Sequence, residues 1–153
     1  MPTQSPLGAV IKGLLAGAAG TGVMTAAQTA YYKAMDVEPS DTPAQVGKRV
    51  IEGVLQRGPV PDDQMEALNN RMHWGYGTSW GVLYGLAAGM SQPRSVRGGL
   101  LFGLVVWGAS LVELPAMKLS PPVWELEPVS LAPDVGFHLV YGAAVGVAFG
   151  ILD

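Results

Sequence analysis

The two histidines of this chain, His73 and His138, occupy matching places in a repeated pattern. Each begins the sequence His-x-x-Tyr-Gly-x-x-x-Gly-x-x-x-Gly. Imidazole titrates near neutral pH and is a common metal ligand, so histidines in matching positions indicate proton or cation chemistry. The other repeated residues are Tyr76, Gly77, Gly81 and Gly85 in the first copy, and Tyr141, Gly142, Gly146 and Gly150 in the second.

Carboxylates lie close to the second histidine in the sequence. Glu113 falls near the end of an apolar stretch, and Glu125 follows in the next loop. An ionisable residue within a membrane span is a functional candidate by default. Imidazole and carboxylate together suit a divalent metal such as zinc. The sequence therefore predicts a site for an ion, a proton or a metal at His73, His138 and Glu113, with Tyr76, Tyr141 and Glu125 as neighbours.

Two other interpretations of the histidines stay open. In the first, each histidine is an anchor near the membrane surface that bonds to a neighbouring loop. In the second, the two imidazoles ligate one haem from facing helices, and the glycines make room for the porphyrin. Tyr76 and Tyr141 would crowd such a ring.

The composition indicates a helical membrane protein. Of 153 residues, 14% are charged, 49% are hydrophobic and 21 are glycine, whereas soluble domains carry about 25% charged residues and about 7% glycine. The lipid bilayer is therefore the expected partner. The net charge of −3 argues against a nucleic-acid partner. The absence of cysteine excludes disulfides and thiolate metal sites.

Four apolar segments are candidates for crossing the membrane, within a single domain that covers residues 1–153. Like sequences recur in like positions, so we expect two repeated hairpins, residues 7–90 and 96–152. Both would enter the membrane from the same side, related by a pseudo-two-fold axis along the membrane normal. The four segments are residues 7–34, 73–90, 98–117 and 135–152.

The glycines predict close helix packing. Glycines four residues apart form a stripe that lets two helix backbones approach each other. We expect the second and fourth spans to be the central pair, crossing at the glycines that follow His73 and His138. The first and third spans also match each other, with Gly13, Gly17 and Gly22 aligned to Gly99, Gly103 and Gly108.

The connection 35–72 is polar but has the pattern of a helix. Thr42 and Pro43 are typical of a helix start, and Gly58-Pro59 of a helix end. Apolar residues lie on one face between them, so we expect an amphipathic helix that packs on its own bundle. A further helix begins near Pro61 and continues into the second span.

The orientation in the membrane is weakly specified. Lys12, Arg94 and Arg97 lie at the end that carries the termini, and the long connection carries more basic residues but also most of the acids. If that connection folds as a cap, the short turn with Arg94 and Arg97 decides the orientation. We therefore expect both termini to be cytoplasmic.

The last third of the chain resembles the YagU-like family of bacterial inner-membrane proteins, whose function is not established. The resemblance covers mainly residues 113–142, in the sequence LPAMKLSPPVWELEP followed by GFHLVYG. It implies a bacterial plasma-membrane location, and it supplies no activity and no catalytic residues. The matching positions are Glu113, Pro115, Met117, Leu119, Pro121, Pro122, Trp124, Glu125, Gly136 and His138.

Three classes of function remain for a chain of this kind. No catalytic triad order, phosphate loop, nucleotide fingerprint or HExxH is present in the sequence, so we do not expect an enzyme. The first hypothesis is binding or transport of an ion, a proton or a small solute at the histidines and Glu113. The second is a structural subunit of a homodimer or a larger membrane complex. The third is a redox carrier with haem or a divalent metal.

Overall fold

The described part of the chain is helical. The computed structural model describes residues 5–91 and 96–152, and these contain helices and no strand. This confirms the all-α prediction. The long helices are α1 (Pro6–Met35), α3 (Met65–Ser91), α4 (Val96–Ala116) and α5 (Pro128–Ile151), and the short elements are α2 (Thr42–Arg49), the π-helix η1 (Val50–Val54) and the 3₁₀ turns η2 (Asp62–Gln64) and η3 (Val123–Glu125).

Three of the long helices, α1, α4 and α5, are long and apolar enough to cross a membrane. The fourth, α3, has 27 residues but begins with the polar sequence MEALNNRM, which precedes His73. The predicted second span therefore forms only the later part of a longer helix. The membrane character of the fold rests on α1, α4 and α5.

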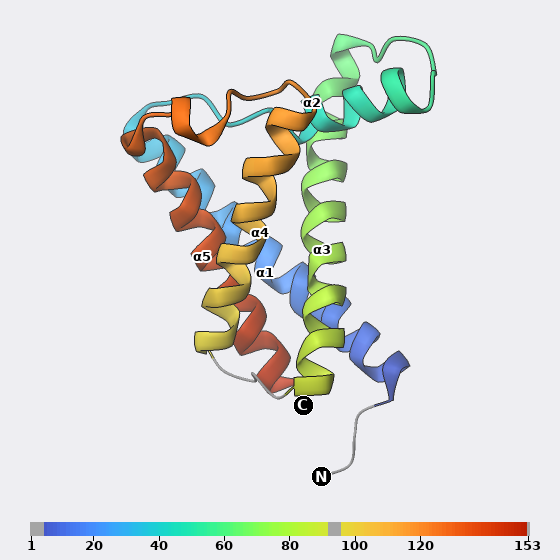
Figure 1. Cartoon of the computed structure of the whole chain (residues 1–153), viewed down its shortest axis with the longest axis vertical. Helices are drawn as coiled ribbons and strands as arrows, with labels where there is room; N and C mark the ends of the chain where they lie inside the picture. The colour runs from blue at the N-terminus through green and yellow to red at the C-terminus, as the bar shows by residue number, and fades with distance from the viewer. Residues whose placement is uncertain (1–4, 92–95, 153) are drawn as a thin grey trace.

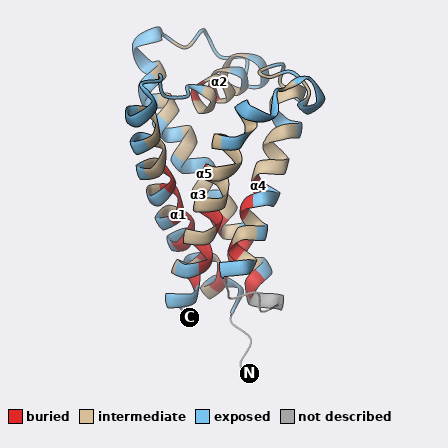
Figure 2. Ribbon diagram, turned by 90° about the vertical axis from the view of Figure 1, so that its left-hand side faces the viewer, coloured by how far each residue is buried: buried red, intermediate tan, exposed pale blue. Residues whose placement is uncertain are grey.

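The long helices alternate in direction along one axis. Helix α1 begins and α5 ends at the same end of the molecule, and the connections 36–64 and 117–127 lie at the other (Figure 1). We call these the terminal end and the loop end. The helices converge toward the terminal end, where most of the buried residues gather, and diverge toward the loop end (Figure 2). The core is thus off-centre.

Local sequence signals fix the ends of α1. The Ser5 side chain accepts a hydrogen bond from the Gly8 backbone N–H at 3.1 Å, and Pro6 occupies the first turn. Ser-Pro is a favourable helix start because it satisfies one free amide and removes another. At the other end, Asp36 is left-handed (φ 53°) and the Val37 N–H bonds back to the Tyr32 carbonyl. This geometry closes the helix.

The C-terminus of α4 uses the same device. Pro115 lies in the last turn, and the helix ends at Ala116. Lys118 has φ 58°, and the Leu119 N–H donates to the Leu114 carbonyl at 2.9 Å. Left-handed backbone at this position usually belongs to glycine, because a Cβ there meets the following carbonyl. Pro115 therefore marks an ordinary helix end.

The connection folds as a helix on the bundle, as the sequence predicts. Asp41 is the N-cap of α2, so the helix begins at Thr42, one residue earlier than a Thr42 cap would place it. Gly47 faces α3, because a Cβ there would meet Leu68 and Met72. The π-helix η1 continues α2 and ends at Val54, so the helix stops four residues before Gly58, where the sequence predicts its end.

The first hairpin is held by contact between two helix backbones. A Cβ at Gly81 of α3 would lie 2.5 Å from the Gly13 carbonyl oxygen and 2.7 Å from the Gly17 nitrogen, both in α1. A Cβ at Gly85 would likewise meet the Ala9 carbonyl oxygen, whereas a Cβ at Gly77 would meet the Thr21 side chain. In a bilayer, helices gain no hydrophobic drive for association, so this close packing holds α1 and α3 together.

The second hairpin has the same construction. A Cβ at Gly142 of α5 would lie 2.7 Å from the Gly103 Cα in α4. A Cβ at Gly99 would lie 3.1 Å from the Gly146 Cα. A Cβ at Gly150 would meet nothing within 4 Å, although its partner in the repeat, Gly85, is packed against α1. Gly150 is therefore not a packing residue.

The prediction that the second and fourth spans form the central pair is wrong. Helices α3 and α5 are packed on α1 and α4 through their glycine faces, and the main contact between the two hairpins joins α1 to α5. A glycine face can approach only a backbone that is itself free of large side chains. The faces of α1 and α4 provide such a backbone, so the glycines act within each hairpin.

The contact register also differs from the sequence alignment by one helical turn. Gly17 meets Gly77 and Gly81, and Gly99 meets the matching pair, Gly142 and Gly146. The structure thus pairs Gly17 with Gly99, whereas the sequence alignment pairs Gly13 with Gly99.

Aromatic rings fill the space between the hairpins. Tyr31 of α1 meets Phe137 of α5 edge to face, with ring centroids 5.4 Å apart. On the other side, Phe102 of α4 lies 4.9 Å from Tyr84 of α3. Gly20 of α1 makes room for α5, because a Cβ there would lie 2.5 Å from a Val145 methyl group. Small residues pack within each hairpin, and large rings pack between them.

We expect Gly81→Ala to destabilise the protein by about 1–3 kcal/mol, because the new methyl group must separate two backbones in contact. The measurement is equilibrium unfolding by SDS titration in a mild detergent, followed by tryptophan fluorescence.

Gly75→Ala is the matched control in the same helix. A Cβ at Gly75 meets nothing within 4 Å, so this substitution should be neutral or stabilising. Equal stability of the two variants would contradict the backbone contact.

Candidate functional site

His73 is held by a hydroxyl of α1. Its Nε2 lies 3.1 Å from the Thr25 Oγ, and that hydroxyl donates to the Thr21 carbonyl at 2.8 Å. Because the Thr25 proton is used in this way, the Thr25 oxygen accepts from His73, and Nε2 carries the ring proton. The other nitrogen, Nδ1, has no hydrogen-bond partner among the residues the structure describes.

His138 is held in the opposite tautomer. Its Nδ1 lies 2.8 Å from the Asp134 carbonyl oxygen, one turn earlier in α5. A carbonyl only accepts, so Nδ1 carries the proton, which also faces the Asp134 carboxylate at 3.5 Å. Within residues 5–91 and 96–152, Nε2 of His138 makes no hydrogen bond. The His138 side chain is 13% exposed.

Asp134 also links the two helices of its hairpin. Its second carboxylate oxygen accepts a hydrogen bond from the Trp107 indole N–H of α4 at 2.9 Å. One carboxylate therefore fixes Trp107 and orients His138. The sequence places Asp134 only among the acids of the loop, whereas in the structure it contacts the candidate site directly.

Glu113 bonds to a tyrosine. The Tyr76 hydroxyl of α3 donates to Glu113 of α4 at 2.8 Å, and both side chains are exposed. This bond joins the two helices near the loop end, beside the aromatic contact of Tyr76 with Trp80. Glu113 thus lies at the α3–α4 face, and its hydrogen bond goes to Tyr76 rather than to either histidine.

Tyr141 crosses the bundle and is 2% exposed. Its hydroxyl donates to the Gly77 carbonyl at 2.6 Å, from α5 to α3. Gly77 follows His73 by one helical turn and Tyr141 follows His138 by three residues, so this bond lies one turn from both imidazoles, toward the terminal end. We call Thr25, His73, Asp134 and His138 the polar layer. The bond from Tyr141 to Gly77 closes this layer on the side of the terminal end.

The residues present do not form the predicted metal cluster. Among the described residues, no group of three or more histidine, aspartate and glutamate side chains could hold a metal ion. Glu125 is exposed in η3, at the surface of the loop end.

A haem does not fit between the histidines either. Nε2 of His73 bonds to Thr25, and the buried Tyr141 bonds to Gly77 one helical turn from both imidazoles. The space beside Gly81 and Gly142, which a porphyrin would need, is taken by neighbouring helix backbone.

A ladder of threonines on α1 is the feature that sequence reasoning missed. Thr21, Thr25 and Thr29 each donate to the carbonyl four residues earlier. Their spacing of four places them on one face of an apolar helix. Hydroxyls repeated at this interval in a membrane span are a signal that the sequence carries.

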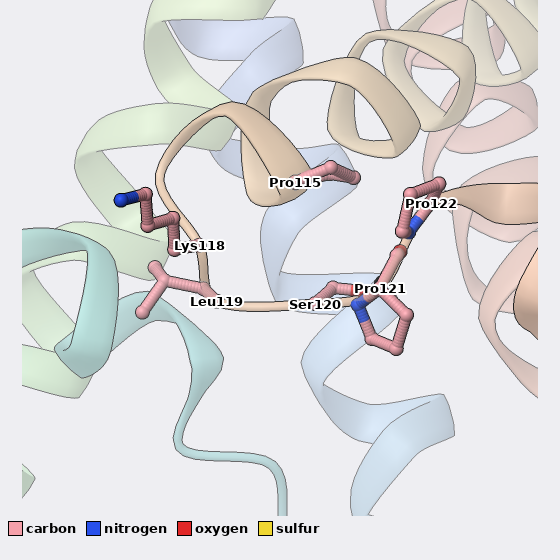
Figure 3. Close-up of a pocket in the computed structure, with 6 residues that line it drawn as sticks. All are labelled: Pro115, Lys118, Leu119, Ser120, Pro121 and Pro122. Atoms are coloured by element: carbon pink, nitrogen blue, oxygen red, sulfur yellow. Dashed lines mark hydrogen bonds between the residues drawn. The ribbon is translucent and has the colours of Figure 1, made fainter.

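Two shallow hollows lie at the loop end. One of about 480 Å³ is lined by the proline-rich turn after α4 (Figure 3), and one of about 350 Å³ lies between η1 and the end of α4. Neither is lined by a histidine. The turn contributes Pro115, Leu119, Pro121 and Pro122 to the lining.

Comparisons with protein-family models, with curated proteins and with solved structures return no match. The site is therefore interpreted from its own geometry.

We expect Tyr141→Phe to lower stability by about 1 kcal/mol, because it removes a hydrogen bond between helices from the buried core. The measurement is the same SDS titration.

Tyr76→Phe removes one hydroxyl of the same kind from an exposed pair. Tyr76 is 37% exposed, and water or headgroups can replace its bond to Glu113, so the loss should be smaller. A larger loss for Tyr76→Phe would contradict the structural role of Tyr141.

Proposed function

We propose that this protein is a four-span membrane protein that binds a proton or a small polar solute at a polar layer near its loop end. The observation that carries the proposal is that each imidazole keeps one ring nitrogen without a partner in the described structure. A free lone pair on a neutral imidazole accepts a proton or a hydrogen bond from a solute.

The position of the two histidines supports one shared layer. They lie on α3 and α5, which both pack on α1 and are joined one helical turn beyond the imidazoles by the hydrogen bond from Tyr141 to Gly77. Thr25 and Asp134 hold one ring nitrogen of each, so the two rings are fixed in place. Because both rings are already held in place, little side-chain entropy is lost when a ligand binds to them.

The remainder of the bundle supports binding at this layer and a closed path beyond it. Toward the terminal end the described core includes the apolar residues Ala16, Ala88, Val145 and Phe149, which are 0% exposed. These four side chains offer a polar solute no hydrogen bond. Transport past the layer requires the two hairpins to move apart at their aromatic contact, which is looser than the glycine contact within each hairpin.

We propose that α3 is the fourth span. It lies beside α1 through the packed glycines, and its direction is opposite to that of α1 (Figure 1). The close glycine contacts within both hairpins support an origin of the hairpins as a repeat, with the contact register shifted by one helical turn between them. A location in the bacterial inner membrane, with cytoplasmic termini, follows from the YagU-like resemblance and the basic residues of the terminal end. Of these, Arg94 lies outside the described residues.

Single-cysteine labelling tests the four spans, because the natural chain has no cysteine. We expect Gly58→Cys and Glu125→Cys to react with a membrane-impermeant maleimide from one side, and Leu152→Cys from the other. If α3 does not cross, Gly58→Cys and Leu152→Cys will react from the same side, and Glu125→Cys from the opposite one. That outcome would overturn the four-span proposal.

Proton flux into liposomes tests the function. We expect purified protein to carry protons, driven by a potassium diffusion potential and reported by an internal pH dye. His73→Ala and His138→Ala should each reduce the flux to that of protein-free liposomes. Thr29→Val is the matched control, because it removes a hydroxyl of the same α1 face that bonds to the Thr25 carbonyl and not to a histidine, and we expect it to retain most of the flux.

Flux that neither histidine substitution changes would overturn the role of the pair. A wild-type protein without flux above that of empty liposomes would overturn transport of protons. In either case a stable partner that co-purifies with the protein would favour the role of an assembly subunit.

A further inference from the structure

The hollow between η1 and the end of α4 combines two cations with an apolar surface. Its volume is about 350 Å³. Arg49 and Lys118 contribute the charges, from the end of α2 and from the turn after α4. The apolar lining comes from Val50 and Val54 of η1 and from Ala116 and Met117.

Neither cation is neutralised by the protein. Within residues 5–91 and 96–152, neither Arg49 nor Lys118 pairs with a carboxylate. Glu52 is the acid nearest in sequence to Arg49, and one oxygen of its carboxylate accepts the Val60 N–H at 2.8 Å. Two unpaired cations beside one hollow are suited to a phosphate group.

The direction of the Lys118 side chain agrees with this assignment. Lys118 lines both hollows, and its side chain points away from Pro121 and Pro122, which line the neighbouring one (Figure 3). Its ammonium group is therefore directed away from the proline-rich turn.

Lys118 is not required by the backbone at its position. Its φ of 58° is left-handed, a conformation that is more favourable for glycine than for a residue with a Cβ. The backbone at Lys118 therefore costs stability, whereas its charge is favourable at the negative end of the α4 helix dipole.

The position of the hollow along the membrane normal indicates a lipid ligand. Lys118 follows the end of α4 by two residues, and α4 is one of the helices that can cross the membrane. The end of such a helix lies at the level of the lipid headgroups. Val54 is 74% exposed at the same hollow, which suits contact with an acyl chain.

We propose that Arg49 and Lys118 bind the phosphate of an anionic phospholipid, whose acyl chain lies along Val50, Val54 and Met117. Basic pockets at helix ends are a known form of headgroup recognition. This site is separate from the histidine layer and does not depend on the proposed function. Acidic residues outnumber basic ones in this chain, so a preference for an anionic lipid would not come from general attraction to an anionic surface.

Native mass spectrometry in detergent tests the lipid site. We expect the protein to retain one phosphatidylglycerol at least fivefold better than phosphatidylcholine with the same chains. Arg49→Gln and Lys118→Gln should each remove this preference. Lys48→Gln is the matched control, because Lys48 adjoins Arg49 in the sequence but does not line the hollow.

Lys118→Gly separates lipid binding from folding. We expect it to lose the preference while its resistance to SDS unfolding stays the same or rises, since glycine suits the left-handed backbone. Equal retention of the two lipids by the wild type, or unchanged preference in both Arg49→Gln and Lys118→Gln, would overturn the site. Displacement of phosphatidylglycerol by millimolar inorganic phosphate would overturn the role of the acyl chain and indicate a site for a free anion.

Discussion

Contact between helix backbones at glycine is the constraint on which the rest of the structure depends. Gly13 and Gly17 of α1 meet Gly81 of α3, and Gly99 and Gly103 of α4 meet Gly142 of α5, at distances that leave no space for a Cβ. Within a bilayer this packing replaces the hydrophobic drive that water would supply. It makes each hairpin a rigid unit, so any movement must occur between hairpins.

The interface between the hairpins is of another kind. Its aromatic rings lie edge to face or tilted, with Gly20 providing the space for Tyr141 and Val145. Rings can slide and rotate with less cost than two backbones in contact, since their packing is less dependent on a single register. The polar layer lies at this interface, with His138 next to Phe137 in the chain. The polar layer therefore lies next to the aromatic interface, along which the two hairpins could separate.

Two separate sites lie toward the loop end: the polar layer with His73 and His138, and the hollow lined by Arg49 and Lys118. The layer holds two imidazoles with defined tautomers through Thr25 and Asp134. The hollow is lined by Arg49 and Lys118, which pair with no carboxylate among the described residues. Since α2 packs on α3 through Gly47, a lipid bound at Arg49 would stabilise the helix that carries His73. Lipid composition and the polar site would thus be coupled through α3.

Local patterns in the sequence predict the helices, the need for close packing and the residues worth testing. Apolar length, proline and glycine act locally, so α1 and α4 could be predicted within two residues at each end, whereas α5 begins at Pro128, seven residues before the predicted start at residue 135. Which helix faces meet depends on the tertiary packing. The two glycine stripes looked like partners, yet each packs on α1 or α4, because any face of small residues can approach any other. The separation of Glu113 from the histidines, and the contacts of Thr25 and Asp134, likewise depend on how the helices rotate and cross, which no local pattern specifies.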